Sequence, residues 1–413
     1  MTRRILVLGA ELAPAYAAEI AAAAVVVGAR RHLDAAGVDG QRRLVLGPLA
    51  PALDAVERSD GPVVVLASGD PGFFGIVRKL AERFGGEREL DVRPGVGSVA
   101  AAFARLGLAW EDAVVVSAHG RDPRVALNVC RAQRKVAVLT APGAGPAEIG
   151  AALAAMPGLR RRLVVASGLG TGRESVEELT PEQAAARDWP DVNVVLSLGD
   201  GAGVGPMRSV AGWAGPPGGG WALPEEAFAH RDAMLTKAEV RALVLARLGP
   251  RPGELVWDVG AGSGSVAVEC ARLGAAAVAV EKAADGVARI RANAAAHGVD
   301  VAVVHGAAPE ALARLPEPDA VFVGGGGADL PGIVRLAAGR ARRTVVVTLA
   351  ALDRVPAVRA ELAAAGWSVD GVLLQASRLA PLPGDVTRLA AANPVFVLWG
   401  VRPGTVGLSG EAE

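Results

Sequence analysis

The stretch Leu255-Val256-Trp257-Asp258-Val259-Gly260-Ala261-Gly262-Ser263-Gly264-Ser265 decides the fold of the second half of the chain. An apolar run ends at an acidic residue, and three glycines then alternate with small residues. The Ala- and Val-rich segment from Val266 to Leu273 follows at once and can form a helix. This pattern predicts a buried strand, a tight turn and a helix N-terminus, the usual cradle for a nucleotide-like ligand. Glycines in such a turn let the backbone bend sharply and approach the ligand closely.

Charged residues near this turn indicate which ligand it binds. A dinucleotide site of the G-x-G-x-x-G type needs a third glycine where this chain has Ser265. Asp258 would repel a pyrophosphate but could attract the ammonium group of S-adenosylmethionine. Glu281 ends the apolar segment from Ala275 to Val280, and a carboxylate at the tip of a neighbouring strand can accept both ribose hydroxyls of an adenosine. The sequence therefore favours S-adenosylmethionine, with a dinucleotide or a purely structural turn as alternatives. Asp258 itself could hold the turn and favour the cationic methionine end, or only stabilise the turn.

Length and composition limit the classes of protein that the chain can belong to. Its 413 residues predict two or three domains. Lys and Arg number 43, as do Asp and Glu, so there is no electrostatic case for nucleic acid or an anionic membrane as the main partner. No apolar run approaches the roughly 18 residues that a membrane span needs. Cys130 and Cys270 lie in apolar segments and are expected to be buried thiols of a cytoplasmic protein, and the five histidines show no spacing that predicts a metal site.

The chain alternates between apolar strands and Ala-rich helices, which predicts an α/β fold with largely parallel sheets covered on both faces. The strands expected in the first half are 5–8, 25–27, 63–67, 113–117, 136–140, 163–166 and 193–198. Residues 199–224 are rich in Gly and Pro and are interpreted as a linker. The predicted organisation is therefore a domain over 1–198, the linker over 199–224 and a second α/β domain over 225–405.

Three polar, glycine-containing loops follow predicted strands in the first half. They are Ser68 to Gly75, Arg93 to Ser98 and Ser117 to Arg121. If the strands are parallel, all three loops emerge at one edge of the sheet, where α/β proteins bind ligands. Each loop could also be a plain turn, because Gly-Asp-Pro is good turn chemistry.

The motifs of the first half resemble the tetrapyrrole methylase family, and in particular its members that methylate C5 of a corrin precursor in cobalamin biosynthesis. The matching segments are Leu66–Pro71 with Phe74-Gly75, Pro94–Val99, Phe103–Leu108 and Ser117–Arg121. The second half resembles the enzymes that methylate C15 and decarboxylate an acetate side chain. Its matching segments are Leu235–Arg241, the glycine turn, Ala308–Leu312, Asp319–Gly327 and Asn393–Val395. The resemblance covers nearly the whole chain, in the order of a fused enzyme.

The resemblance implies two methyltransferase domains on one chain. Residues 1–198 are expected to form the tetrapyrrole-methylase fold of two α/β lobes and to act at C5. Residues 225–405 are expected to form a Rossmann-like class I methyltransferase that acts at C15 and removes CO₂ from the C12 acetate. The resemblance further implies one S-adenosylmethionine site per domain, a small-molecule corrin precursor as substrate, and a homo-oligomer.

The resemblance also assigns site residues, although it identifies no catalytic side chain. The expected cofactor contacts of the second domain are Thr236, Asp258, Gly260, Ala261, Gly262, Ser263, Gly264, Glu281 and Ala307. Those of the first domain are Gly69, Asp70, Pro71, Gly97 and Ser98, while His119 and Arg121 are expected to face the substrate. Arginines should line the cleft of a substrate with many carboxylates, and the candidates are Arg105, Arg121, Arg124 and Arg378. The run Arg160 to Arg162 is expected at the surface.

One loop departs from the family pattern. Tetrapyrrole methylases typically begin with Gly-x-Gly-Pro-Gly, whereas this chain has Gly9-Ala10-Glu11-Leu12-Ala13-Pro14. The loss of two glycines puts the usual contact of that loop in doubt. Three other hypotheses stay open: a fused methyltransferase for another tetrapyrrole, a dinucleotide-dependent oxidoreductase, and a chain in which only the second domain is active.

Overall fold

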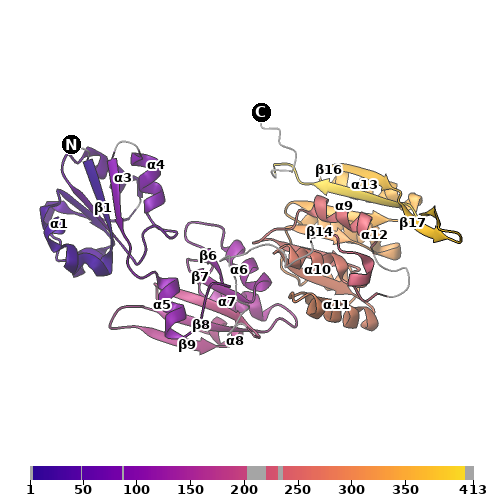
Figure 1. The fold of residues 1–413 in the computed structure, drawn as a ribbon, viewed down its shortest axis with the longest axis horizontal. Coiled ribbons are helices and arrows are strands. Elements are labelled where there is room, and N and C mark those ends of the chain that lie inside the picture. The colour runs from indigo at the N-terminus through magenta and orange to yellow at the C-terminus, as the bar shows by residue number, and fades with distance from the viewer. Residues whose placement is uncertain (1–2, 48, 86–87, 202–219, 231–235, 405–413) are drawn as a thin grey trace. The chain divides into compact units, whose positions relative to one another are not determined.

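A computed structural model describes residues 3–47, 49–85, 88–201, 220–230 and 236–404 (Figure 1). The chain forms two compact units. The first comprises Met1–Trp110, Ala166–Val176 and Val192–Val194, and the second comprises Glu111–Val165, Glu177–Asp191 and Val195–Glu413. Most of the predicted linker, residues 202–219, lies outside the described residues, so the division at 199–224 stays a prediction.

The first sheet is built around β1. Its strands are β1 (Arg3–Gly9), β2 (Val25–Gly28), β3 (Arg43–Val45), β4 (Val63–Ala67) and β5 (Arg88–Arg93), in the order β3-β2-β4-β1-β5. All pairings are parallel. Side chains alternate along β1: Ile5 and Val7 pack with α3 and α4, whereas Leu6 and Leu8 pack with α1 and α2. The covering helices are α1 (Ala17–Ala22), α2 (Arg30–Ala35), α3 (Leu49–Arg58) and α4 (Val77–Phe84).

A second sheet follows, and it corrects one prediction. Its strands are β6 (Val114–Ser117), β7 (Lys135–Leu139), β8 (Arg161–Ser167), β9 (Ser175–Leu179) and β10 (Asn193–Gly199), in the order β6-β7-β10-β8-β9. The helices that follow α4 along the chain are α5 (Ser98–Arg105), α6 (Pro123–Ala132), α7 (Pro146–Ala154) and α8 (Pro181–Ala185). The loops after β4 and β5 share an edge as predicted, but the loop after β6 belongs to this other sheet. The expectation of three loops on one sheet edge is therefore wrong.

The third sheet carries the opening stretch as its central strand β11. Its strands are β11 (Leu255–Val259), β12 (Ala276–Glu281), β13 (Ala302–His305), β14 (Ala320–Val323), β15 (Thr344–Leu349), β16 (Ser368–Leu374) and β19 (Val395–Val401). The order is β13-β12-β11-β14-β15-β19-β16. The pairings among β11 to β15 are parallel, and β19 runs antiparallel to β15 and β16. A separate hairpin consists of β17 (Ser377–Leu382) and β18 (Val386–Ala391).

Helices cover both faces of the third sheet (Figure 1). They are α9 (Ala238–Leu248), α10 (Ser265–Arg272), α11 (Ala284–Ala296), α12 (Leu330–Arg340) and α13 (Val355–Ala364). The period of two along β11 sends Leu255, Trp257 and Val259 toward α12 and α13, and Val256 toward α9 and α10. The Asp258 side chain therefore lies on the face of the sheet that α9 and α10 cover.

Short 3-10 turns complete the structure: η1 (Ala10–Tyr16), η2 (Gly40–Arg42), η3 (Glu225–Ala227), η4 (Glu310–Leu312), η5 (Gly327–Asp329) and η6 (Leu352–Arg354). Both cysteines are buried free thiols, as predicted. Among the described helices, none has the length and apolar character needed to cross a membrane.

The arginine run at β8 is not simply at the surface. The Arg161 side chain is 2% exposed, and its guanidinium pairs with Asp300 at 2.9 Å. It also donates to the carbonyl oxygens of Cys130 and Arg131. The prediction that all three arginines lie at the surface is wrong for Arg161, because a guanidinium can be buried once its donors are satisfied.

Candidate functional site

A cleft of about 950 Å³ opens in the C-terminal α/β region. Its walls come from segments at the carboxyl ends of the parallel strands, the place where open α/β sheets bind ligands. The lining includes the glycine turn after β11, Glu281 at the end of β12, Ala307 after β13, Gly324–Gly327 after β14 and Thr348–Ala350 at β15. Thr236, Lys237, Lys282, Arg378 and the segment Ala390–Asn393 also line it.

The glycine turn is shaped by close backbone packing. Gly260, Gly262 and Gly264 all have positive φ, at 71°, 58° and 73°. A Cβ on Gly260 would lie 3.1 Å from the backbone nitrogen of Gly325, so the turn packs directly on the glycine run after β14. A Cβ on Gly264 would instead lie 2.9 Å from Ile290. The first glycine therefore shapes the cleft, and the last one allows helix α11 to approach.

Glu281 connects β12 to the glycine turn. Its Oε2 atom accepts a hydrogen bond from the backbone N–H of Gly262, and its Oε1 atom accepts one from that of Ala283, both at 2.9 Å. The residue is 9% exposed and lines the cleft. Each carboxylate oxygen can accept more than one hydrogen bond. Glu281 can therefore bind two ligand hydroxyls while the backbone holds it in place.

Asp258 occupies a different position from the one expected. It is 1% exposed and does not line the cleft. Its Oδ2 atom accepts a hydrogen bond from the backbone N–H of Ala267 at 3.0 Å, in the first turn of α10, and its Oδ1 atom has no partner in the described structure. Burial, together with the nearby charge of Glu281, raises the pKa of this carboxyl to about 7. Asp258 thus supports the turn from behind, which is the structural alternative left open by the sequence.

Seven of the nine cofactor contacts expected in the second domain line the same cleft. They are Thr236, Gly260, Ala261, Gly262, Ser263, Glu281 and Ala307. Asp258 and Gly264 lie behind the turn. The structure thus brings together residues that are separated by up to 71 positions in the sequence (307 − 236).

Asn293 is a positioning residue that the sequence did not reveal. Its side-chain amide in α11 donates to the carbonyl of Ser263 at 2.8 Å and to that of Ala229 at 2.9 Å, and its oxygen accepts from the N–H of Ala229 at 2.7 Å. This side chain therefore ties the glycine turn to the segment before α9. An asparagine on the buried side of an Ala-rich helix is the only signal that could have indicated it.

A second network missed from the sequence is a buried ion pair. Arg241 and Glu269 are both fully buried and contact each other at 3.2 Å. Arg241 also donates to the carbonyl of Thr236 at 2.6 Å, and Glu269 accepts from the N–H of Leu223 at 2.7 Å. Arg272 contacts Glu269 from the same helix. The pair therefore fixes Thr236, a residue that lines the cleft.

Arg378, a candidate for binding substrate carboxylates, already has acidic partners. Its guanidinium forms paired hydrogen bonds with Glu225 at 2.7 and 2.8 Å and with Glu239 at 2.6 and 2.8 Å. Hydrogen bonding from Arg378 lowers the pKa of Glu225 to about 2. The arginine thus fastens β17 to the segments around α9. Lys237 and Lys282 also line the cleft, and no ion pair of either is found within the described residues.

The expected sites of the first domain converge at the carboxyl edge of the first sheet. A Cβ on Gly69 would lie 2.8 Å from the carbonyl oxygen of Val96 and 3.1 Å from the Cα of Gly97. Asp70 accepts a hydrogen bond from the N–H of Gly72 at 2.8 Å, which orders its own loop. The carbonyl of Pro71 accepts from the N–H of Val77 at 3.2 Å, and Ser98 is the first residue of α5. Gly69, Asp70 and Gly97 are therefore close neighbours.

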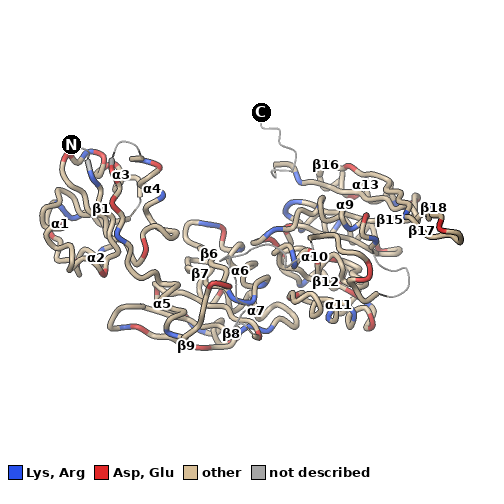
Figure 2. Tube along the Cα trace, in the orientation of Figure 1, with Lys and Arg blue, Asp and Glu red and all other residues tan. Residues whose placement is uncertain are grey.

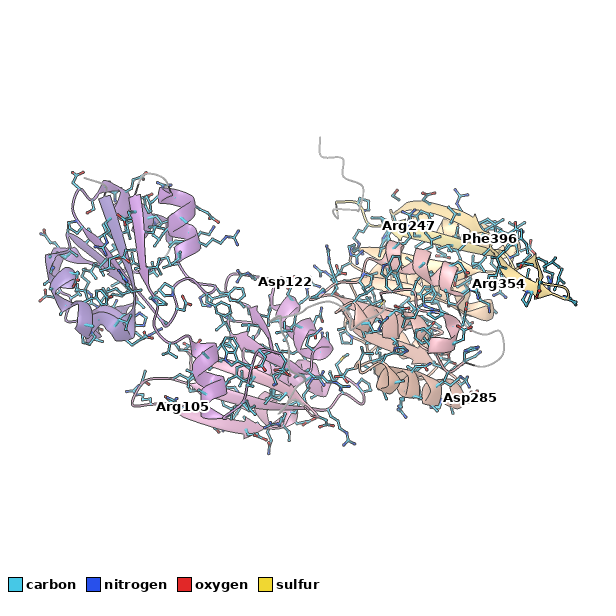
Figure 3. All side chains as sticks on the ribbon, in the orientation of Figure 1. Arg105, Asp122, Arg247, Asp285, Arg354 and Phe396 are labelled. Carbon is cyan, nitrogen blue, oxygen red and sulfur yellow. The ribbon has the colours of Figure 1, made fainter. Side chains whose placement is uncertain are left out.

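The residues expected to face the substrate lie on the loop after β6, in the second unit. His119 and Arg121 are both exposed there. Two further candidate arginines have acidic partners: Arg105 (labelled in Figure 3) pairs with Glu174, and Arg124 pairs with Asp122 and Asp319. Neither arginine is a free cation for a substrate carboxylate.

The residues of the C-terminal cleft fit S-adenosylmethionine. The glycine turn offers backbone without side chains, and Glu281 offers carboxylate oxygens for ribose hydroxyls. The cleft is also large enough for a drug-sized ligand, and most of its lining is small or apolar.

Comparison with known proteins identifies the family. Residues 226–402 match the precorrin methyltransferase domain, and residues 7–185 match the tetrapyrrole (corrin/porphyrin) methylases. A precorrin-6Y C(5,15)-methyltransferase [decarboxylating] from a Sinorhizobium species is 36% identical over 321 residues, covering 75% of this chain and 74% of the relative. The enzyme of the same name from Mycobacterium tuberculosis is 32% identical over 397 residues, covering 93% and 92%.

A shorter relative matches the second half alone. A probable cobalt-precorrin-6B C(15)-methyltransferase (decarboxylating) from Pyrobaculum calidifontis is 35% identical over 183 residues, covering 43% of this chain and 93% of the relative. The resemblance and the fold class predicted from the sequence are confirmed. Because the two fused relatives align along most of their length, this chain belongs to the family of precorrin-6Y C5,15-methyltransferases (decarboxylating).

Proposed function

We propose that this chain methylates a corrin precursor of the precorrin-6Y type at C5 and C15 and removes CO₂ from its C12 acetate side chain. The domain over 1–198 would act at C5, and the domain over 225–405 would carry out the C15 methylation and the decarboxylation. Each domain would bind one S-adenosylmethionine. The observation that supports this most directly is the cleft in which Glu281 holds the glycine turn, within a chain related to fused enzymes of this name.

The residues of the chain act mainly by binding and orientation. S-adenosylmethionine, when bound, supplies a methyl group already activated by the sulfonium charge. Glu281 would hold the ribose through its hydroxyls, and the backbone of Gly260 to Ser263 would fix the depth of the ligand in the cleft. Correct placement of the reacting atoms about 3 Å apart is worth several kcal/mol of the barrier. Orientation is therefore the main contribution of the protein to methyl transfer, and the proton that the methylated carbon loses would pass to solvent.

The decarboxylation would use the substrate's own conjugation. When the C–CO₂ bond breaks, its electron pair passes into the conjugated macrocycle, and a proton then replaces CO₂ on the side-chain carbon. Lys237 and Lys282 at the cleft would bind other carboxylates of the substrate, which leaves the reacting acetate in the less polar interior. The exclusion of water from that carboxylate would favour its loss.

We also infer that the protein is a homo-oligomer. The hairpin of β17 and β18 exposes Leu379, Leu382, Val386 and Leu389 by 79%, 43%, 54% and 68%. Leu379 and Leu389 are paired across the two strands, so their side chains form one apolar surface. Contiguous apolar surface of this kind is typical of a protein interface. A second copy of this chain is the partner that the inference assigns to it.

The charge distribution of the chain bears on the partners that it would bind. Lys and Arg are interspersed with Asp and Glu in both units (Figure 2), in line with the zero net charge. We expect no nucleic-acid or membrane partner because of that balance, and a cytoplasmic location because the two cysteines are free thiols.

Calorimetry separates the proposal from the oxidoreductase alternative. Full-length protein titrated with S-adenosylhomocysteine should bind two equivalents per chain, and titration with NADH should give no heat of binding. Tight NADH binding that competes with S-adenosylhomocysteine would favour the dinucleotide alternative. A single equivalent of S-adenosylhomocysteine would limit donor binding to one domain.

A further inference from the structure

Glu11 lies where three loops of the first sheet meet. Strand β1 is flanked by β4 and β5, and Gly9 ends it directly before the 3-10 turn that carries Glu11. A Cβ on Gly9 would lie 2.5 Å from the nitrogen of Gly95 and 2.6 Å from the carbonyl oxygen of Gly69. A Cβ on Gly95 would overlap the carboxylate of Glu11. The Glu11 side chain therefore covers the backbone of the loop after β5.

The charge of Glu11 is available to a ligand. The residue is exposed, and within the described residues the structure records no hydrogen bond or ion pair of its carboxylate. The neighbouring Asp70 has its Oδ1 atom bound to the N–H of Gly72 in its own loop. Glu11 thus places an unneutralised negative charge at the carboxyl end of a central parallel strand, where α/β proteins bind ligands.

Arg31 supplies a positive charge at the same edge. It belongs to α2, which follows β2, and β2 is the neighbour of β4. Its guanidinium donates to the hydroxyl of Ser68 at 2.9 Å and to the ring nitrogen Nε2 of His32 at 3.2 Å. In the described part of the chain, it forms no salt bridge with a carboxylate. Since Ser68 directly precedes Gly69, this cation borders the same loop.

The charges of Arg31 and Glu11 both affect His32. Burial and the charge of Arg31 lower the pKa of His32, while the charge of Glu11 opposes them. His32 Nε2 lies 3.3 Å from the hydroxyl of Ser68. The cation of Arg31, at Ser68, and the anion of Glu11, against Gly95, therefore both act on His32 at this edge of the sheet.

We propose that Glu11 and Arg31 recognise the zwitterionic amino-acid end of S-adenosylmethionine in the N-terminal domain, Glu11 through the ammonium and Arg31 through the carboxylate. This assignment rests on the proposed donor site of that domain. Opposite charges on the protein match the opposite charges of an α-amino acid group. Glu11 would thereby replace a ligand contact that the Gly-x-Gly-Pro-Gly loop makes in other tetrapyrrole methylases.

The ammonium is the better partner for Glu11 than the sulfonium. Methyl transfer removes the sulfonium charge, so a carboxylate beside it would stabilise the reactant more than the transition state. The ammonium keeps its charge throughout the reaction. Its pairing with Glu11 would therefore strengthen binding without opposing the chemistry.

The test is calorimetry of the full-length chain carrying E281A. This substitution weakens donor binding in the C-terminal cleft, so the heat of binding reports the N-terminal site. The two probes are S-adenosylhomocysteine and 5′-methylthioadenosine, which lacks the amino-acid end. E11Q and R31Q should each raise the Kd of S-adenosylhomocysteine about tenfold, the effect expected for one charge-assisted contact. Both variants should leave the Kd of 5′-methylthioadenosine unchanged.

Two control variants test whether the effect is specific. Glu19 and Arg30 are exposed residues of the same unit, so E19Q and R30Q remove the same charges elsewhere. Both controls should leave the Kd of each probe unchanged. A thermal unfolding midpoint equal to that of the parent would show that E11Q and R31Q are folded.

Three results would overturn the assignment. Unchanged S-adenosylhomocysteine binding in E11Q and R31Q would remove both residues from recognition, while the donor site itself stood. Tighter binding in E11Q would show that Glu11 obstructs the site. An E281A chain that binds neither probe would refute the N-terminal donor site, and with it both the proposed function of that domain and this assignment.

Discussion

The Oε2 atom of Glu281 lies 2.9 Å from the backbone nitrogen of Gly262 and accepts its hydrogen bond. One side chain thereby joins the tip of β12 to the centre of the glycine turn after β11. A Cβ on Gly286 would lie 2.6 Å from the Cγ of Glu281, so helix α11 holds this side chain from the other side. The acceptor and the turn form one preorganised element, which is the structural basis of the proposed C15 site.

Replacement of Glu281 by alanine should disable the C-terminal domain alone. E281A removes the acceptors for the ribose hydroxyls and frees the turn, so donor affinity at this site should fall about a hundredfold, as for the loss of two hydrogen bonds to a charged group. The C5 methylation should continue. Mass spectrometry of the product would show one added methyl and no loss of CO₂.

The matched control for this variant is E317A, because Glu317 is an exposed glutamate of the same domain. It should add both methyl groups and release CO₂ as the parent does. If E281A also added both methyl groups, Glu281 would have no role in binding the donor.

The buried Asp258 should make stability fall with rising pH. Its pKa is raised from 3.8 to about 7 in the folded protein, so between pH 4 and 7 the folded state holds a proton that the unfolded state has lost. The free energy of unfolding therefore decreases through this window, by about 4 kcal/mol in total if the whole shift is expressed. Below pH 4 both states are protonated, and above pH 7 both are ionised.

D258N isolates this contribution, because asparagine resembles the protonated carboxyl. Urea unfolding at several pH values should show the stability of the parent relative to D258N falling between pH 4 and 7. The cost of burying the new amide should not depend on pH. A difference that stays constant or rises over this window would contradict the raised pKa.

Loss of Glu269 should destabilise the second domain strongly. E269A would leave Arg241 and Arg272 buried without their carboxylate. This change should lower the free energy of unfolding by about 3–5 kcal/mol. The control E82A breaks the exposed pairs of Glu82 with Arg78 and Lys79 and should change unfolding little. Chemical denaturation measures both. If E269A unfolded at the same denaturant concentration as the parent, the pair would not hold the segment at Thr236.

The apolar hairpin should control assembly. L379K places a charge on the surface shared by Leu379 and Leu389, so the oligomer should dissociate. Leu352 is 65% exposed outside the hairpin, and L352K is the matched control that should leave assembly unchanged. Analytical ultracentrifugation gives the mass of each variant. An unchanged mass for L379K would place the interface elsewhere.

Local signals made the C-terminal site largely predictable. An apolar run with one acidic residue, followed by alternating glycines, encodes strand, turn and helix within a short stretch of sequence, and β11 forms in the apolar run. Glu281 was predicted because the end of the next apolar run marks the end of the adjacent strand. Each of these inferences depends on contacts between segments close in sequence.

The features that were missed depend on distant contacts. The role of Asp258 depends on its position on the side of β11 that packs against α10. The sequence does not reveal this side, because the neighbouring residues in the strand are all apolar. Arg378 meets Glu225 across 153 positions of sequence, so its partners were not visible as a motif. The loop after β6 was assigned to the wrong edge because sequence alternation does not show where one parallel sheet ends and the next begins.

The most direct test of the whole account is the mass of the reaction product. Purified full-length protein is incubated with a precorrin-6Y-type corrin precursor and S-adenosylmethionine, and the product is analysed by mass spectrometry. The account predicts that the product carries two added methyl groups and has lost one CO₂. A product with only one added methyl group, or with two methyl groups and its acetate carboxyl intact, would contradict it.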